Sequence, residues 1–184
     1  MSLRLITPPQ TEPVSVETAK AFLRVDHTLE DALIAGLITS ARQEGEDLAR
    51  RAFITQTWEQ VLSQWPSNSS LVVLRPPLQS ITSVKYYNTA NAEFTWTDYV
   101  VDNRSDPGRV IFRSTPSTTL LETGGVVVRF VAGFGSTPQS LPGRFSDLIV
   151  SLVAHWYENR ESRDVPDNIK DGFVNERSIW WRDG

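Results

Sequence analysis

The chain has 184 residues, of which 40% are hydrophobic and 22% charged, and its formal net charge is −4. These values are typical of one soluble globular domain, and the negative balance argues against general nucleic-acid binding. The absence of cysteine excludes disulfides and thiolate zinc sites. No apolar run reaches the ~18 residues of a membrane span, so neither a transmembrane helix nor a signal peptide is predicted.

Two helices are predicted near the N-terminus. Ser15 is a good N-cap for a helix over residues 15–24. A longer helix is predicted over residues 29–52, because apolar residues recur there at the spacing of one helix face. They are Leu33, Ile34, Leu37, Ile38, Ala41, Gly45, Leu48 and Ala52. The charged residues of the same segment are expected to form a solvated face; they are Arg42, Glu46, Asp47 and Arg50.

The pattern changes to short strands between residues 54 and 133. Segments rich in Thr, Val and aromatic residues alternate there with turn residues, which is typical of an antiparallel β unit. The predicted strands cover residues 54–65, 71–74, 81–87, 94–101, 110–112 and 126–132. The pair Gly124-Gly125 predicts a tight hairpin that joins residues 118–121 to the last of these strands.

A third helix is predicted over residues 142–160, where Pro142 suits the first turn. Its apolar face consists of Phe145, Leu148, Ile149, Leu152, Val153, Trp156 and Tyr157. The predicted fold class is therefore α+β. Two N-terminal helices and a long C-terminal helix form a small bundle, with an antiparallel β unit (about 54–133) inserted and an extended C-terminal tail. Residues 1–161 form the domain and residues 162–184 the tail.

The sequence contains no clear catalytic constellation. His155 and Glu158 could supply two metal ligands from one helix face, but a metal site needs further ligands and no second such pair exists. His27 lies in a polar turn. No GxSxG motif frames a nucleophilic serine, and the glycines of residues 133–135 lead into Ser-Thr-Pro instead of a phosphate-binding helix. A structural histidine is favoured at position 155, and no enzyme activity, metal site or cofactor is predicted.

The tail is too polar, and too broken by Pro and Gly, to fold alone. It nevertheless contains apolar side chains that are costly to leave in water. They are Ile169, Phe173, Val174, Ile179, Trp180 and Trp181. These residues could pack back on their own domain, or they could order on a partner with the aromatic side chains as anchors. We favour the second interpretation, which makes the six residues a predicted partner-binding segment.

Four passages follow one another in a fixed order along residues 1–161. The first comprises PPQTEPVS at residues 8–15, AK at 19–20 and LRVD at 23–26. The second comprises EDALI at residues 30–34 and AR at 41–42. The third comprises ITQTW at residues 54–58, LRPPL at 74–78 and ITSV at 81–84. The fourth comprises FVAGFG at residues 130–135 and LVAHWYENR at 152–160. Together the passages resemble the head–tail connector (adaptor, or head-completion) proteins of tailed bacteriophages and related gene-transfer particles.

The resemblance implies a structural function and no catalysis. Connector proteins form a ring, expected to be dodecameric, beneath the portal protein of the filled capsid. The ring extends the DNA channel, through which packaged DNA passes without sequence-specific binding, and it joins the capsid to the next tail or stopper component. The implied location is the head–tail interface of a virion, after synthesis in the host bacterial cytoplasm. The tail is then expected to dock on the portal, and the β insertion to form inter-subunit or tail-side surface.

One alternative comes from another class of protein. A stand-alone α+β adaptor domain could bind other proteins through its sheet edge and its C-terminal tail.

Overall fold

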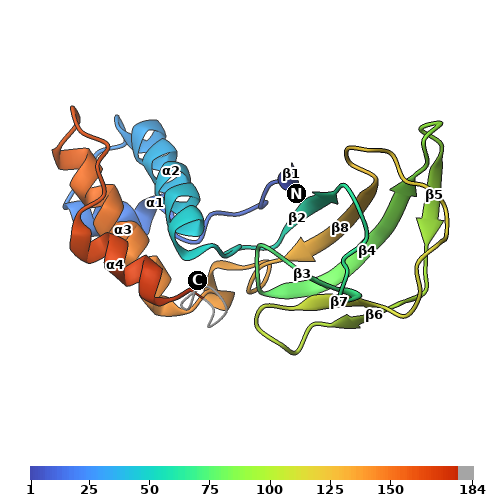
Figure 1. Cartoon of the computed structure of the whole chain (residues 1–184). Helices are drawn as coiled ribbons and strands as arrows, with labels where there is room; N and C mark the ends of the chain where they lie inside the picture. Colours follow the sequence, from blue (N-terminus) through green and yellow to red (C-terminus); the bar gives the residue numbers. More distant parts are fainter. Residues whose placement is uncertain (178–184) are drawn as a thin grey trace.

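The computed structural model describes residues 1–177, and Figure 1 shows that they form a helical lobe and a β lobe, joined side by side. The helices are α1 (Val16–Leu23), α2 (Asp31–Ala49), α3 (Gly143–Glu158) and α4 (Asp167–Asn175), and a 3-10 turn at Pro138–Ser140 precedes α3. The strands are β1 (Ser2–Thr7), β2 (Gln56–Leu62), β3 (Ser70–Val72), β4 (Leu78–Tyr87), β5 (Glu93–Trp96), β6 (Tyr99–Asp102), β7 (Arg109–Phe112) and β8 (Val126–Ala132). The predicted α+β class is confirmed.

The helical lobe has one hydrophobic core, to which all four helices contribute. Helix α1 begins as its N-cap predicts, since Ser15 Oγ accepts a hydrogen bond from the Thr18 amide at 3.1 Å. An eight-residue helix is too short to be stable alone, so α1 depends on its packing against α2 and α3. The buried faces of α2 and α3 supply Ile34, Leu37, Ile38, Ala41, Phe145, Ile149, Leu152 and Val153. Each such large side chain contributes about 1.5–3 kcal/mol when fully buried.

The β lobe consists of two antiparallel sheets. The larger sheet has five strands in the order β1-β2-β8-β4-β5, and the smaller has three in the order β3-β7-β6. Strand β8 lies in the middle of the larger sheet, where Phe130 is opposite Trp58 on one side and Ile81 on the other. Because side chains alternate along a strand, Val126, Val128, Phe130 and Ala132 are all buried. The position of β8 agrees with the strand that the sequence predicts over residues 126–132.

The core of the β lobe lies between its two sheets. Aromatic side chains fill much of the space, and the rings of Trp65 and Phe112 meet edge to face with centroids 5.1 Å apart. The buried residues of this core are Leu71, Val84, Tyr86, Val110, Phe112, Val126 and Val128. A second, smaller core near the helical lobe contains Ala52, Val73, Leu78, Phe130 and Ala132.

Two expectations about local structure are wrong. The predicted hairpin at Gly124-Gly125 does not form, because β8 pairs with β2 and β4 and Leu120 makes only an isolated bridge to Asn88. Leu33, predicted to be a core residue, is exposed. Residues Ser2–Thr7 form strand β1 and pair with β2, a pairing that the local sequence pattern does not predict.

Candidate assembly surfaces and the joint between the lobes

The chain passes between the two lobes three times, because β1 precedes the first two helices and α3 follows the last strand. The crossing segments are residues 8–15, 50–55 and 133–142, and we call them the joint. Two of the segments are hydrogen-bonded to each other, since the Thr55 amide donates to the Gly135 carbonyl at 2.9 Å. The lobes are therefore held together by backbone pairing as well as by side chains.

Glycine is required within the joint at position 133. Gly133 has φ of 128°, and a Cβ there would lie 2.6 Å from the Ile54 carbonyl group, so no larger residue fits. Phe134, the next residue, packs on Phe145 of α3 with ring centroids 5.8 Å apart. The FVAGFG passage singled out in the sequence thus turns the chain tightly from β8 towards the helices.

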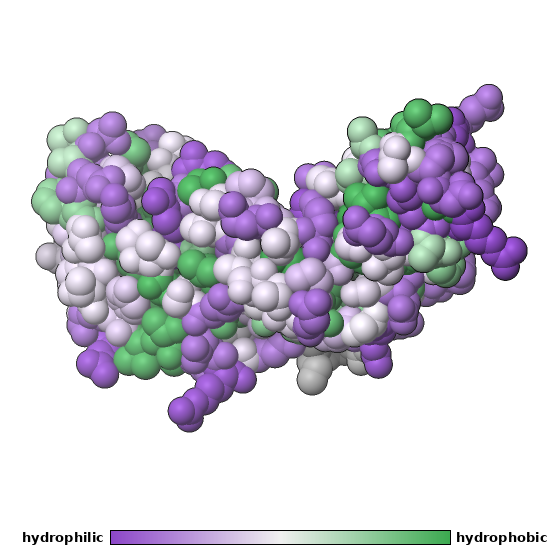
Figure 2. Space-filling view, turned by 180° about the vertical axis from the view of Figure 1, so that it is seen from behind, coloured by the Kyte–Doolittle hydropathy of each residue, from purple (hydrophilic) through white to green (hydrophobic). Residues whose placement is uncertain are grey.

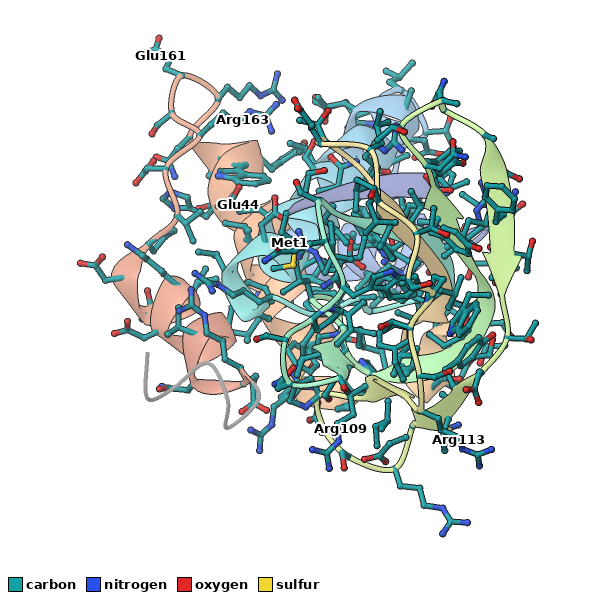
Figure 3. The ribbon with its side chains drawn as sticks, turned by 45° about the vertical axis from the view of Figure 1, so that its right-hand side comes forward. Met1, Glu44, Arg109, Arg113, Glu161 and Arg163 are labelled. Carbon is teal, nitrogen blue, oxygen red and sulfur yellow. The ribbon has the colours of Figure 1, made fainter. Side chains whose placement is uncertain are left out.

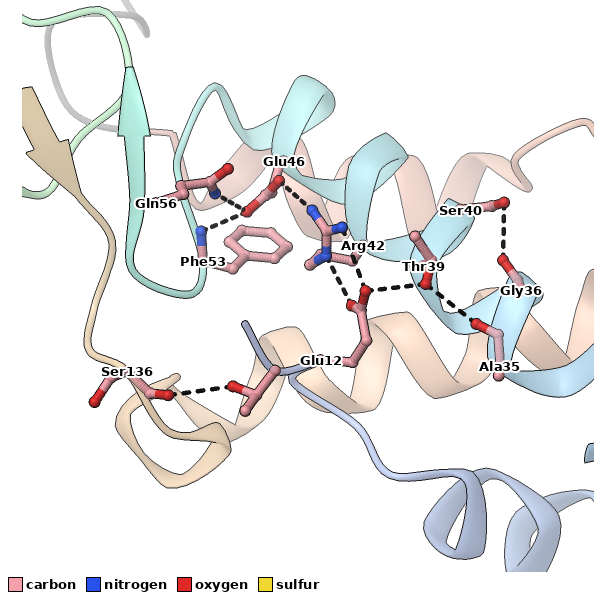
Figure 4. Close-up of polar contacts among 11 residues, drawn as sticks. Glu12, Ala35, Gly36, Thr39, Ser40, Arg42, Glu46, Phe53, Gln56 and Ser136 are labelled. Carbon is pink, nitrogen blue, oxygen red and sulfur yellow. Dashed lines mark hydrogen bonds and ion pairs between the residues drawn. The ribbon is translucent and has the colours of Figure 1, made fainter. Parts of the chain in front are cut away.

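A buried carboxylate organises the helical side of the joint (Figure 4). Glu46 accepts hydrogen bonds from the Phe53 amide at 2.8 Å and from Gln56 Nε2 at 2.6 Å. Its second oxygen accepts from the Arg42 guanidinium at 2.9 Å. Arg42 also donates to Glu12 from the first crossing segment, at 2.7 Å. One cluster, which we call the Glu46 cluster, therefore connects α2 with two segments of the joint.

The electrostatics of this cluster follow from its burial. Burial raises the pKa of Glu46, although the nearby charge of Arg42 works in the opposite direction. Burial also works to lower the pKa of Arg42, but the hydrogen bond and charge of Glu12 and the charge of Glu46 outweigh it, so that this pKa is raised. The expectation that Arg42 and Glu46 belong to a solvated face is wrong, because both are buried and each satisfies the other in place of water.

A second arginine connects both lobes with the end of the chain that the structure describes. Arg51 Nε donates to the backbone carbonyl of Glu176, just after α4, at 2.7 Å. The same guanidinium donates to Asp106, in the loop between β6 and β7, at 2.6 Å. Arg51 is buried and lies beside the Phe134 ring. A planar guanidinium with several donors suits such a three-way contact.

The predicted docking tail is largely part of the helical core. Residues 167–175 form α4, in which Ile169 is 6% exposed and Phe173 0% exposed; Val174 is half-buried. Phe173 fits against α2 because Gly45 has no side chain there, and a Cβ on Gly45 would lie 2.7 Å from the Phe173 ring. The prediction of an extended tail is therefore wrong for this segment, which packs back on its own domain. The predicted anchors Ile179, Trp180 and Trp181 lie outside the described residues.

The candidate histidines belong to ordinary polar contacts. His155 Nε2 lies 3.4 Å from an oxygen of Asp164, in the loop that leads to α4. Glu158 is exposed at the end of α3, and His27 lies 4.0 Å from Glu30. Figure 3 shows Glu161 at the outer end of the same α3–α4 loop. Within residues 1–177 no three His, Asp or Glu side chains gather closely enough to hold a metal ion.

The open face of the larger sheet carries a ladder of paired charges. Arg4 on β1, Glu59 on β2 and Arg129 on β8 lie opposite one another in register. Glu59 accepts hydrogen bonds from Arg4 at 3.2 Å and from Arg129 at 2.7 Å. Strand β1 is an edge strand, so its outer N–H and C=O groups have no strand partner in this sheet. This edge and the ladder are surfaces suited to protein contact.

Large apolar side chains remain exposed at several places on the two lobes. On the helical lobe they are Phe22, Leu29 and Leu33, and on the β lobe they are Met1, Leu5, Ile6, Phe94, Val100 and Ile111. Figure 2 shows hydrophobic surface at the top of the helical lobe, where α2 begins, and at the bottom of the β lobe. Exposed apolar patches on a folded chain mark sites of protein contact. No helix within residues 1–177 is both long and apolar enough to cross a membrane.

The residues of the joint are those that sequence reasoning missed. Arg51 and Glu46 sit in segments whose local pattern is that of a charged helix end, and their partners are distant along the chain. A weak signal did exist for Glu46, because it stands four residues after Arg42, and opposite charges at this spacing can pair along one helix face.

Comparisons with known proteins give matches among solved structures only. No protein-family model matches the chain, and no curated protein matches it. A chain in the neck of an empty GTA particle computed with C6 symmetry matches with a TM-score of 0.80 and 20% identity, over 97% of this chain and 96% of that one. A chain in the virion of a native gene transfer agent (GTA) particle matches with a TM-score of 0.78 and 20% identity, with the same coverage.

A third match is a chain in the neck of a native GTA particle computed with C12 symmetry. Its TM-score is 0.75 and its identity 19%, over 97% of this chain and 96% of that one. The likeness covers both lobes and the joint, so it concerns the whole arrangement and not the helices alone. It agrees with the resemblance to connector proteins that the sequence passages indicate. The chain has the fold of a protein found in the necks and virions of gene transfer agent particles.

Proposed function

We propose that this chain is a structural component of the neck of a phage-like particle. In this proposal, copies of the chain form a ring beneath the portal, extend the DNA channel and join the capsid to the next tail or stopper component. The observation that carries the proposal is the shared fold over 97% of the chain with proteins of particle necks, one of them computed with C12 symmetry. The order of the four sequence passages supports it independently.

The physical character of the molecule fits such a role. The joint connects the two lobes through the buried Glu46 cluster and Arg51, which suits a subunit that keeps one shape within a ring. A net charge of −4 suits a channel through which DNA moves, because the 22 acidic side chains outnumber the 18 basic ones and the chain as a whole does not attract phosphates. A dodecameric ring, the head–tail interface of a virion and assembly from subunits made in the host cytoplasm are parts of the same proposal, as is the absence of catalysis.

We also propose that the C-terminus docks on the portal, but through fewer residues than the sequence analysis suggests. Because Ile169 and Phe173 are core residues, the anchors available for docking are Ile179, Trp180 and Trp181 beyond α4. Aromatic side chains dominate interface energetics when they enter pockets. A chain truncated after Arg177 keeps α4 and should fold, but it should attach poorly to portal-bearing heads.

The direct test is to mix the purified full-length chain with its cognate portal protein and to image the mixture by electron microscopy. The expected result is a ring of this chain, with the symmetry of the portal, attached to the portal's narrow end. A chain that stays monomeric beside an intact portal contradicts the proposal. A monomer that instead captures an extended peptide along the β1 edge favours the alternative of a stand-alone adaptor domain.

A further inference from the structure

We propose that neighbouring copies in the ring contact each other through two different surfaces of the helical lobe. One surface, which we call the α2 ridge, consists of Phe22 on α1, Leu29 in the turn just before α2 and Leu33 in the first turn of α2. The other, which we call the α3–α4 groove, lies between α3 and α4. The ridge of one copy fits the groove of the next. The inference rests on the proposed ring and names the contact that builds it.

The ridge has the wrong polarity for a surface that stays in water. Leu29 is 90% exposed, Phe22 59% and Leu33 41%. Further along the same face of α2, Gly36 has open space where a side chain would be. The opposite face of α2 is packed on α3 and α4, so the ridge points away from both helices. Figure 2 shows hydrophobic surface at the top of the helical lobe, where α2 begins.

The groove supplies a complementary shape on another side of the same lobe. It has a volume of about 490 Å³ and is lined by Leu148 and Ser151 of α3 and by Gly172 of α4, among others. Gly172 contributes no side chain, and Leu148 is only partly buried against it. Figure 1 shows α3 and α4 on the outer side of the helical lobe and α2 on the side of the β lobe. A hollow of this size accommodates apolar side chains.

Opposite charges flank the two surfaces. Arg24 opens the turn that contains Leu29, and it is exposed. Asp147 is exposed on the rim of the groove. Within residues 1–177 neither side chain has an ion-pair partner of its own chain, whereas Arg144 on the same rim is paired with Glu176. Arg24 of one copy and Asp147 of the next would pair when ridge and groove meet.

The symmetry of the proposed ring favours a second copy as the occupant of the groove. A closed ring requires a heterologous contact, in which two different surfaces of one subunit meet. An apolar ridge that enters a groove elsewhere on the same fold produces this kind of contact and repeats from copy to copy. If ridge met ridge instead, the contact would be self-complementary and would stop at a dimer.

Cysteine cross-linking tests the contact directly, because the chain has no native cysteine. The double variant Leu29→Cys with Asp147→Cys is assembled on the portal and treated with a short bis-maleimide. We expect a ladder of covalent multimers in denaturing gels, and no ladder from either single variant. The matched control, Val100→Cys with Asp147→Cys, replaces an exposed apolar residue of β6 and should give no ladder. Dimers from Leu29→Cys alone would show a ridge-to-ridge contact and overturn the proposal.

Charge reversal gives a second, independent readout. Arg24→Asp and Asp147→Arg should each weaken ring formation, by about fivefold per contact if the pair is worth about 1 kcal/mol. The double reversal should restore it. If wild-type rings form on the portal but neither the ladder nor the rescue is seen, the contact is wrong and the ring remains. If the wild-type chain forms no ring, the ring proposal fails, and this contact fails with it.

Discussion

The two ends of helix α2 differ in whether apolar or charged side chains are buried. At its start Leu29 and Leu33 are exposed to water, although they are apolar. Towards its end Arg42 and Glu46 are buried, although they are charged. The buried charges have partners within the chain, whereas neither leucine belongs to a hydrophobic cluster of residues 1–177. The end of α2 is thus completed by contacts within the chain, whereas the start of α2 stays exposed and is the part that the proposed ring contact would cover.

The buried charges and the exposed leucines bear on two different properties of the molecule, its stability and its association. Buried charges with satisfied hydrogen bonds report on structure, because leaving any one of them without a partner would be costly. Exposed leucines bear on the proposed assembly, because the other side chains of residues 1–177 leave both of them exposed. Substitutions at the end of α2 should therefore change stability, and substitutions at its start should change association.

The largest effect is expected at Glu46. Glu46→Ala leaves the Arg42 guanidinium and the Phe53 amide without their buried acceptor, and it should lower the free energy of unfolding by about 3–5 kcal/mol. Glu44→Ala, on the same helix (Figure 3), is the control and should cost about 0.5 kcal/mol or less. Urea denaturation of both variants measures the difference. A loss under about 1 kcal/mol at Glu46 would show that the cluster does not hold the joint.

Two glycines of α2 extend the comparison. Gly45→Ala places a methyl group 2.7 Å from the Phe173 ring, and this overpacking should cost about 1–3 kcal/mol. Gly36→Ala meets open space and should stabilise the helix by about 0.5–1 kcal/mol. Thermal unfolding of the two variants gives the signs. Equal shifts in one direction would contradict the packing of α4 against the end of α2.

The two ends of α2 should also respond to pH in opposite directions. Hydrogen bonds from Tyr157 and then Arg160 lower the pKa of Glu30 below its ordinary value of 4.5, so its stabilising contribution is lost as the pH falls below that value. Burial raises the pKa of Glu46, so its contribution is lost as the pH rises above 4.5. Unfolding of the wild type, E30Q and E46Q across this range measures both slopes. Slopes of the same sign would contradict the assignment.

The smallest change in stability is expected at the start of the helix. Leu33→Asp replaces an exposed side chain, and a carboxylate is favourable in the first turn, so the free energy of unfolding should change by no more than about 0.5 kcal/mol. Ring formation on the portal should nevertheless be lost. Circular dichroism and electron microscopy of the same preparation separate the two effects. A folded variant that still forms normal rings would remove Leu33 from the interface.

Local patterns predict the elements whose side chains repeat regularly. The face of α3 with Ile149 and Leu152, and the alternation along β8, follow from periodicity because each buries one continuous stripe. Helix α2 was predicted to extend to residue 52, but it ends at Ala49 because Arg50 adopts a left-handed conformation with φ of 52°. The local sequence pattern does not predict a left-handed conformation for a residue other than glycine.

What sequence reasoning missed depends on partners far along the chain. Strand β1 is stabilised by β2, more than fifty residues away. Helix α4 is stabilised by packing of Phe173 against Gly45 of α2 and against the ring of Phe53. Because these partners are distant in the sequence, Phe173 is easily mistaken for an exposed anchor that binds another protein. Arg42 and Glu46 are likewise buried by segments that only the fold brings near.

The helical lobe is built from two segments that lie far apart in the sequence, and this separation determines the order in which parts of a newly made chain can fold. Roughly ninety residues of β lobe separate the end of α2 from the start of α3, and at about 5–20 residues per second they take several seconds to leave the ribosome. The β lobe can close before α3 exists, whereas the buried face of α2 must wait for the last helices. A nascent chain therefore has the α2 ridge but not yet the α3–α4 groove. Only a complete subunit can contact one neighbour through its ridge and another through its groove.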